Sequence, residues 1–272
     1  MKRRFSIARI FIYLILIVAS FVSVFPFFWM VTGMTNSAVD IVRGKMTFGT
    51  MFFHNIRVLF TEYDMAHVLL NSIKVTGLTV VLCILVCSMA AYGFVMYKSK
   101  ITQRLYALTM LTMMIPFAAL MIPLFQIIVQ FKLINTHFGL IITSITSVFI
   151  IFFFRQSFLS YPYEIIQSAR VDGAGEFRIF FKIFVPSMKS TFFAAAIYAF
   201  MTSWNSYMWP LIILQTNDKK TTTLLISYLS SAYVPQYGVI MAAIVISTLP
   251  IIIIFFAFQK QFVQGLLGSV KA

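Results

Sequence analysis

The sequence predicts an all-α membrane protein with six transmembrane helices and with both termini in the cytoplasm. The first observation behind this prediction is composition, because 61% of the 272 residues are apolar and only 10% are charged. An average soluble domain carries about 25% charged residues. The second is that the apolar residues form six runs, each near the roughly 20 residues that a helix needs to cross a bilayer. The third is an excess of Lys and Arg on one side of these runs.

The six apolar runs define the expected spans. They lie at about 10–33, 73–97, 105–131, 138–158, 188–214 and 238–259. The first run follows a basic N-terminus but is longer than the roughly 7–15 apolar residues of a signal peptide, so we expect an uncleaved first span. No Gly- or Ser-rich linker separates the runs. The simplest expectation is a single transmembrane domain over 1–272, with core spans between about 73 and 259.

The distribution of basic residues predicts the orientation. The net charge of +14 would suggest nucleic-acid binding in a soluble protein. In a membrane protein it is explained by Lys and Arg beside the cytoplasmic ends of the spans, so no nucleic-acid partner is expected. With the N-terminus inside, the cytoplasmic segments hold 14 of the 21 Lys and Arg residues. This orientation places 159–187 in the cytoplasm and 215–237 outside.

The spans contain neither an energy source nor a catalytic site. The acidic residues all fall between the apolar runs, whereas a proton-coupled transporter usually keeps a carboxylate within the bilayer at a cost of about 2.5–3.5 kcal/mol or more. The chain has no phosphate-binding glycine loop and no histidine set beside a nucleophile and a carboxylate. Cys83 and Cys87 lie in an apolar run, which favours packing over a metal site. We therefore predict a non-enzyme, without metal, that receives energy from another protein.

Prolines and polar aromatic residues mark candidate pore positions. Pro116 and Pro123, seven residues apart in the third run, should kink a helix and free carbonyls that need protein or water. Bent packing and a pore-facing gate helix both fit this pattern. In the fifth run, Asn205 lies beside Trp204 and Tyr207. An amide within a span requires a partner helix or a wet cavity, so contact between helices and pore lining both remain open.

The cytoplasmic stretch 161–186 differs from the rest in being amphipathic and mixed in charge. Glu164 and Gln167 lie three residues apart and should share a helix face. Asp172-Gly173 then favours a turn, and a second amphipathic stretch follows. The pattern predicts two short helices joined by a tight bend. Their apolar side chains need a covering surface, which could be the membrane or a protein cleft.

This stretch resembles the cytoplasmic EAA loop in permease subunits of ATP-binding-cassette (ABC) importers. Its matching residues are Pro162, Glu164, Ala169, Asp172, Gly173, Ala174, Phe177, Ile183 and Pro186. Other similar positions are Asn71-Ser72, Ala90 to Phe94, Ile115-Pro116, Ile122 to Phe125, Asn135-Thr136, Trp204-Asn205 and Phe262 to Leu267. Together they cover nearly the whole chain. The chain is most similar to the shorter, six-span permease subunit of maltose-type carbohydrate importers.

The resemblance implies the type I ABC importer permease fold and a set of partners. It implies a heterodimer with a second permease subunit that completes the pore, a cytoplasmic ATPase dimer that binds ATP and Mg²⁺, and an extracytoplasmic substrate-binding protein that meets 215–237. The membrane would be that of a bacterial or archaeal cell, with no cofactor bound directly to this chain. The implied ATPase-coupling residues are Glu164, Gln167, Ser168, Ala169, Asp172, Gly173 and Ala174.

The motif departs from the family pattern at two of these positions. Gln167 and Ser168 stand where the family usually has Glu and Ala. A glutamine can hydrogen-bond but cannot form an ion pair, so Glu164 is the candidate to supply the missing carboxylate. Because the maltose-type sugar is held mostly by the other permease subunit, the resemblance implies few sugar contacts here. A stand-alone secondary transporter or channel, and a membrane scaffold, are the alternatives.

Overall fold

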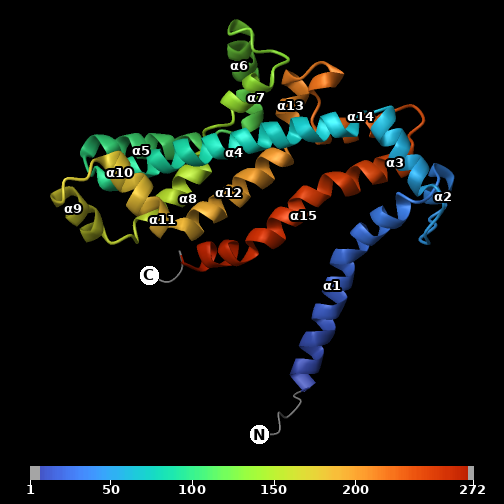
Figure 1. The fold of residues 1–272 in the computed structure, drawn as a ribbon, viewed down its shortest axis with the longest axis horizontal. Helices are drawn as coiled ribbons and strands as arrows, with labels where there is room; N and C mark the ends of the chain where they lie inside the picture. Colours follow the sequence, from blue (N-terminus) through green and yellow to red (C-terminus); the bar gives the residue numbers. More distant parts are fainter. Residues whose placement is uncertain (1–6, 269–272) are drawn as a thin grey trace. The chain divides into compact units, whose positions relative to one another are not determined.

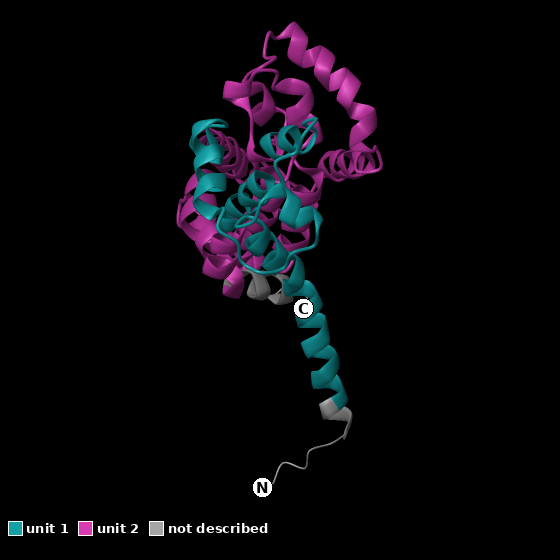
Figure 2. Cartoon of the chain, turned by 90° about the vertical axis from the view of Figure 1, so that its right-hand side faces the viewer, with its two compact units in different colours: residues 1–66, 225–250 teal, residues 67–224, 251–272 magenta. Residues whose placement is uncertain are grey.

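The structure, a computed structural model of the full chain, describes residues 7–268, with side chains from 11 to 260. Within that range every regular element is helical (Figure 1). The chain divides into two compact units, one of residues 1–66 and 225–250 and the other of residues 67–224 and 251–272 (Figure 2). The elements are α1 (Ile7–Gly33), α2 (Ala38–Val42), α3 (Phe52–Thr61), α4 (Met65–Met96), α5 (Lys100–Thr112), α6 (Phe117–Gln130), α7 (His137–Ile142), α8 (Val148–Phe158), α9 (Tyr163–Val171), α10 (Glu176–Ile179), the π-helical η1 (Phe180–Phe184), α11 (Val185–Ser187), α12 (Lys189–Trp204), α13 (Met208–Ile213), the 3₁₀-helical η2 (Asn217–Lys219), α14 (Thr222–Ser230) and α15 (Tyr237–Gly268).

Three of the predicted spans correspond to long continuous helices. α1, α4 and α15 contain the stretches Phe11–Gly33, Met65–Met96 and Tyr237–Lys260, each long and apolar enough to cross a membrane. α4 begins before the predicted start at residue 73. Its first turns contain polar residues, which is why the apolar run begins later than the helix. One of these residues, Asn71, donates a hydrogen bond from its side chain to the Asp218 carbonyl. Pro250 lies inside α15 without ending it.

One predicted span contains a sharp bend, and another begins at one. α5 and α6, which cover the predicted span 105–131, meet at 103°, and the run from Glu176 to Ser187 meets α12 at 85°. Pro116 lies at the first bend with φ −65° and ψ 139°, outside the helical region. A proline donates no backbone hydrogen bond and pushes the preceding residue towards extended backbone, which explains the break. Pro123, in contrast, lies within α6.

Two predicted spans are interrupted. The stretch 138–158 forms α7 and α8 with a connection at 143–147, and 188–214 includes α12 and α13 with a connection at Asn205–Tyr207. Ser147 caps α8 by accepting a hydrogen bond from the Ile150 N–H. In the described part of the chain, three helices could cross a membrane, or five if each bent pair counts as one span. The six-span count and the orientation of the termini stay predictions.

The first unit contains a buried polar cluster at the end of α1. The amide nitrogen of Asn36 donates to the carbonyls of Thr32, at 2.9 Å, and Thr47, at 2.8 Å. Asn55 on α3 donates to the carbonyls of Met34 and Asn36. These bonds satisfy backbone carbonyls at the end of α1 and in the segment that follows it. The cluster thereby fixes the chain between α1 and α3.

The second unit has an aromatic core that packs against the stretch 161–186. Phe154, Phe158 and Phe184 are fully buried. The Tyr92 ring of α4 packs edge-on against Phe180 and Phe184, with centroids 5.2 and 5.1 Å apart. Edge-on aromatic pairs contribute about 0.5–1.5 kcal/mol beyond the burial of their area. The core therefore joins α4 and α8 to η1.

Candidate functional site

The first candidate site is the coupling segment, which we define as residues 161–186. Its first helix, α9, begins after Pro162 and ends at Asp172. Gly173 has φ +77°, in the left-handed region that favours glycine. The Ala174 N–H then donates to the Ala169 carbonyl at 3.0 Å, which closes the turn. The structure thus contains the two short helices and the tight bend that the sequence predicts.

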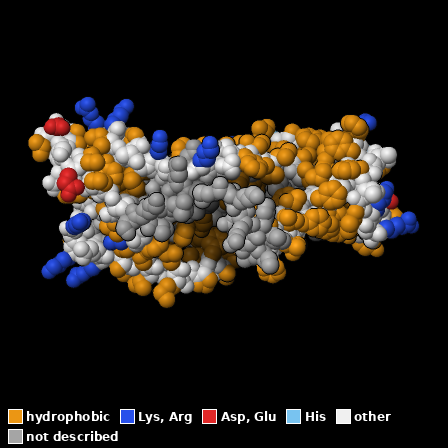
Figure 3. Space-filling view, turned by 90° about the horizontal axis from the view of Figure 1, so that it is seen from below, with side chains coloured by type: hydrophobic (Ala, Val, Ile, Leu, Met, Phe, Trp, Pro, Cys, Tyr) orange, Lys and Arg blue, Asp and Glu red, His pale blue; other side chains and the backbone are white. Residues whose placement is uncertain are grey.

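The outward face of α9 brings together four of the seven predicted coupling residues. Glu164, Gln167, Ser168 and Asp172 line an open pocket together with Val171, whose side chain is 87% exposed. Lys, Arg and acidic side chains gather around this end of the second unit, beside exposed hydrophobic ones (Figure 3). The face offers one apolar group within a rim of carboxylate, amide and hydroxyl groups. Its contact with an ATPase stays a prediction.

The remaining coupling residues have other positions. Ala169 is 8% exposed and packs with Ile166 against the aromatic core, so its side chain faces into the unit. Ala174 is half-buried beside the same core, and Gly173 is exposed at the turn. Ala169 and Ala174 therefore hold α9 in place from behind. The small side chains allow α9 to approach the core closely.

An ion pair that the sequence analysis missed braces the bend. The Arg170 Nε donates to the Glu176 Oε1 at 2.7 Å, and Glu176 also accepts a hydrogen bond from the Tyr92 hydroxyl at 3.2 Å. Arg170 further donates to the Tyr163 hydroxyl at 3.3 Å and lies over the Tyr97 ring. The guanidinium lowers the pKa of the Glu176 carboxyl below its usual value. The sequence offered one sign of this pair, since Arg170 and Glu176 carry opposite charges on either side of the predicted turn at Asp172-Gly173.

This network connects three elements of the second unit. Arg170 belongs to α9, Glu176 begins α10, and Tyr92 belongs to α4. The Tyr92 ring also contacts the aromatic core, so polar and apolar contacts act at the same residue. A displacement of α9 would therefore be transmitted to α10 and to α4.

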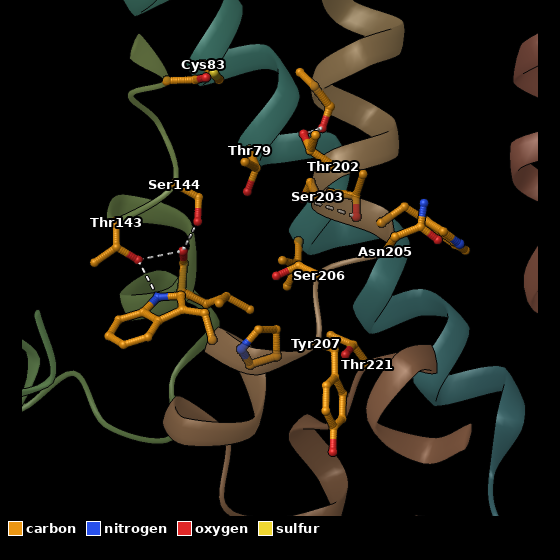
Figure 4. Close-up of a pocket in the computed structure, with 18 of the residues that line it drawn as sticks. Thr79, Cys83, Thr143, Ser144, Thr202, Ser203, Asn205, Ser206, Tyr207 and Thr221 are labelled. Carbon is orange, nitrogen blue, oxygen red and sulfur yellow. Dashed lines mark hydrogen bonds between the residues drawn. The ribbon is translucent and has the colours of Figure 1, made fainter. Parts of the chain in front are cut away.

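The second candidate site is a cavity of about 550 Å³ in the second unit (Figure 4). It lies among α4, the α7–α8 connection and the α12–α13 connection. All its lining side chains are uncharged, and half of them carry a hydroxyl. The hydroxyl-bearing residues are Ser72, Thr76, Thr79, Thr143, Ser144, Ser147, Thr202, Ser203, Ser206, Tyr207 and Thr221.

Three of the four predicted pore residues line this cavity. Trp204 and Asn205 end α12, and Tyr207 follows in the connection to α13. Asn205 donates from its amide to the Met201 carbonyl at 2.9 Å. Pro116 is exposed at the α5–α6 bend and does not line the cavity, whereas its neighbour Phe117 does. The role of these residues in a substrate path stays a prediction.

The contribution of α4 to the cavity was not predicted from the sequence. Ser72, Thr76, Thr79 and Cys83 recur at intervals of three and four residues, which places them on one helix face. This spacing of polar residues, within an otherwise apolar run, could have indicated a polar face on α4. Cys83 lies 3.7 Å from Cys87, sulfur to sulfur. Among the described residues no group of three or more His, Cys, Asp or Glu could hold a metal ion.

Polar side chains fix the start of the segment 215–237, which the sequence predicts to lie outside the membrane. Asn71 donates to the carbonyls of Asp218, at 2.9 Å, and Lys220, at 3.1 Å. The Nε2 atoms of His67 and His137 lie 2.8 and 2.9 Å from the carbonyls of Asp218 and Lys219. Burial lowers the pKa of the His137 imidazole below its usual value. The Asn135 Oδ1 likewise accepts the backbone N–H groups of residues 215 and 216.

Comparisons with known proteins agree with the resemblance seen in the sequence. Residues 83–268 match the family described as the inner membrane component of binding-protein-dependent transport systems. A lactose transport system permease protein from Rhizobium radiobacter is 51% identical over 259 residues, which is 95% of each chain. An arabinooligosaccharides transport system permease protein from Bacillus subtilis is 35% identical and covers 98% of each chain.

A solved structure shares the fold. It belongs to a bacterial ABC transporter involved in the import of the acidic polysaccharide alginate, and it superposes with a TM-score of 0.83. The match covers 96% of this chain and 100% of the other, at 22% sequence identity. The chain therefore belongs to the family of inner membrane components of binding-protein-dependent transport systems.

Proposed function

We propose that this chain is a transmembrane permease subunit of an ATP-driven, binding-protein-dependent importer of a carbohydrate, and that it forms half of the translocation pore. The observation that carries the proposal is the coupling segment. Its helix α9 presents an open polar face, and the Arg170–Glu176 ion pair holds α9 against α10. The relatives named for lactose and arabinooligosaccharide transport support a carbohydrate as the substrate. The chain itself would not hydrolyse ATP.

The coupling segment would receive the work of the ATPase. The ATPase would bind the exposed face of α9, where Gln167 offers an amide and Glu164 a carboxylate. Closure of the ATPase dimer on ATP and Mg²⁺ would then displace α9. The Arg170–Glu176 pair and the Tyr92 hydrogen bond would pass this displacement to α4. Because α4 lines the cavity, its movement would change access to the pore.

The other partners follow from the same role. A second permease subunit would complete the pore as a heterodimer, and an extracytoplasmic substrate-binding protein would contact the outer segment 215–237. The exposed aromatic side chain of Tyr233, near the end of that segment, offers such a protein an anchor. The chain would cross the cell membrane of a bacterium or archaeon as one domain of six spans, with both termini in the cytoplasm.

Gly173→Pro tests the coupling role directly. Proline requires a φ near −65°, whereas Gly173 has φ +77° and donates its N–H to the Arg170 carbonyl. We expect the purified complex of permeases and ATPase to lose the stimulation of ATP hydrolysis by sugar-loaded binding protein. Gly175→Ala is the matched control, because Gly175 has φ −70° and open space around its Cα.

Two results would count against the proposed function. One is full stimulation of ATP hydrolysis in a Gly173→Pro complex that is still inserted in the membrane. The other is purification of the chain without an ATPase and a second permease, together with sugar transport that continues without ATP. The latter result would favour a stand-alone secondary transporter or channel.

A further inference from the structure

The cavity in the second unit contains a buried hydroxyl without a hydrogen-bond partner. Thr79 on α4 is 4% exposed, and its Oγ1 atom makes no hydrogen bond. A buried threonine within a helix can donate to a carbonyl three or four residues earlier. The Thr79 hydroxyl instead points into the space among α4, the α7–α8 connection and the α12–α13 connection (Figure 4). A buried polar group without a partner is unfavourable, so we expect a ligand or a water molecule to hydrogen-bond with the Thr79 hydroxyl.

The walls around Thr79 suit a polyhydroxylated molecule. Ser144 and Ser203 lie on opposite sides of the cavity, and Asn205 lies at its exposed edge (Figure 4). The Ser144 hydroxyl donates to the Leu140 carbonyl and the Ser203 hydroxyl to Thr76, so both offer a ligand an oxygen that accepts. Trp204 and Tyr207 supply aromatic rings. The Thr79 hydroxyl can both donate and accept, and the other wall hydroxyls accept, which fits the hydroxyl groups of a sugar. A volume of about 550 Å³ is within the range of small-molecule sites.

The same walls disfavour a charged solute. Every polar side chain that lines the cavity is neutral. A carboxylate or phosphate that enters such a cavity loses its hydration and finds no opposite charge there. A neutral saccharide loses only hydrogen bonds that the wall hydroxyls can replace. The cavity should therefore distinguish neutral from acidic sugars of similar size.

We propose that this cavity is a saccharide site of this subunit, and that it selects uncharged over acidic saccharides through Thr79 and the surrounding neutral hydroxyls. The inference rests on the proposed import function for its class of ligand. It differs from what the family resemblance implies, because few sugar contacts were expected in this subunit. It assigns to the permease a selection step separate from that of the binding protein.

Tryptophan fluorescence of the full chain in lipid nanodiscs tests the proposal. Two of the three tryptophans, Trp204 and Trp209, line the cavity, and a Trp29→Phe background removes the third. We expect lactose to change the fluorescence saturably and digalacturonate, at equal concentration and ionic strength, to leave it unchanged. Because the chain is tested alone, the result does not depend on the ATPase.

Thr79→Val removes the hydroxyl while keeping the side-chain shape. Loss of one neutral hydrogen bond should weaken lactose binding by about 3- to 10-fold. Thermal stability should stay equal or rise, since the hydroxyl has no partner in the chain. A structural role for the hydroxyl would instead lower stability. Thr109→Val is the matched control, because the Thr109 hydroxyl lies outside the cavity and donates to the Leu105 carbonyl.

Asn205→Lys adds a cation at the exposed edge of the cavity and should allow digalacturonate to bind. The proposal is overturned if lactose gives no response, if both sugars respond equally, or if Thr79→Val binds lactose as the parent does. These outcomes are distinct from a failure of the proposed function. Loss of lactose binding would leave ATPase coupling intact, and loss of coupling would leave lactose binding measurable.

Discussion

The ion pair between Arg170 and Glu176 yields the sharpest prediction about the coupling segment. Two unit charges 4 Å apart attract by about 4 kcal/mol at an effective dielectric constant of about 20. The side chains are 30% and 38% exposed, so solvent screening reduces that attraction. Hydrogen bonds to charged groups contribute about 1.5–3 kcal/mol when they are well shielded. We expect a net coupling energy of about 1–2 kcal/mol between the two residues.

A double-mutant cycle with Arg170→Met and Glu176→Gln isolates this energy. The cycle removes the separate effect of losing the Arg170 contact with Tyr97. Thermal unfolding of the purified complex is the assay, and each kcal/mol corresponds to about 2–4 °C in a domain of 150–250 residues. Sugar-stimulated ATP hydrolysis, measured on the same samples, should fall in both single variants. The Lys219–Asp218 pair is the control, because its side chains are 41% and 61% exposed and should couple by less than about 1 kcal/mol.

The pH dependence provides an independent check of the same pair. Arg170 lowers the pKa of Glu176 in the folded chain, so its stabilising contribution is fully present above the unfolded value of about 4.3. It is lost as the pH falls through the lowered value. A coupling energy near zero at pH 7, or unchanged sugar-stimulated ATP hydrolysis in both single variants, would refute the proposed role of the Arg170–Glu176 pair.

Further predictions concern the polar contacts at the start of segment 215–237 and the first unit. Gly49→Ala and Gly238→Ala should each lower the thermal stability, because a Cβ would meet the amide groups of Asn36 and Asn55 respectively. Gly77→Ala is the control, because the space around Gly77 is open, and it should leave the stability unchanged. Equal melting temperatures for all three variants would contradict this packing. His137 has a lowered pKa, so the unfolded chain binds more protons just below pH 6.5 and stability should fall from pH 7.5 to 5.5. His137→Gln should reduce that fall in a melting experiment, and an unaltered pH dependence would contradict it.

The sequence predicted the elements that composition and local chemistry determine. The long apolar runs gave α1, α4 and α15, and Asp172-Gly173 predicted the bend of the coupling segment. Family resemblance identified the exposed residues Glu164 and Gln167, which share one face of α9. These features depend on neighbours along the chain.

The remaining features depend on contacts between distant parts of the chain. Pro116 predicted a kink, but the angle of 103° is set by packing that the sequence does not reveal. The Glu176 contact with Tyr92 joins residues 84 positions apart. Ala169 belongs to the coupling motif, yet the core behind α9 decides that its side chain faces inward. The cavity likewise forms only when α4 meets the α12–α13 connection.

The most direct test of the proposed function is uptake of the saccharide that the binding protein carries, in proteoliposomes that contain the whole complex, with ATP hydrolysis measured in the same vesicles. With ATP on the side of the coupling segment and sugar-loaded binding protein on the other, we predict uptake that depends on ATP. Asp172→Lys places a cation in the exposed face of α9 and should abolish uptake while the chain remains inserted. Uptake without ATP, or uptake by Asp172→Lys at the unmodified rate, would contradict the claim that α9 receives the work of a separate ATPase.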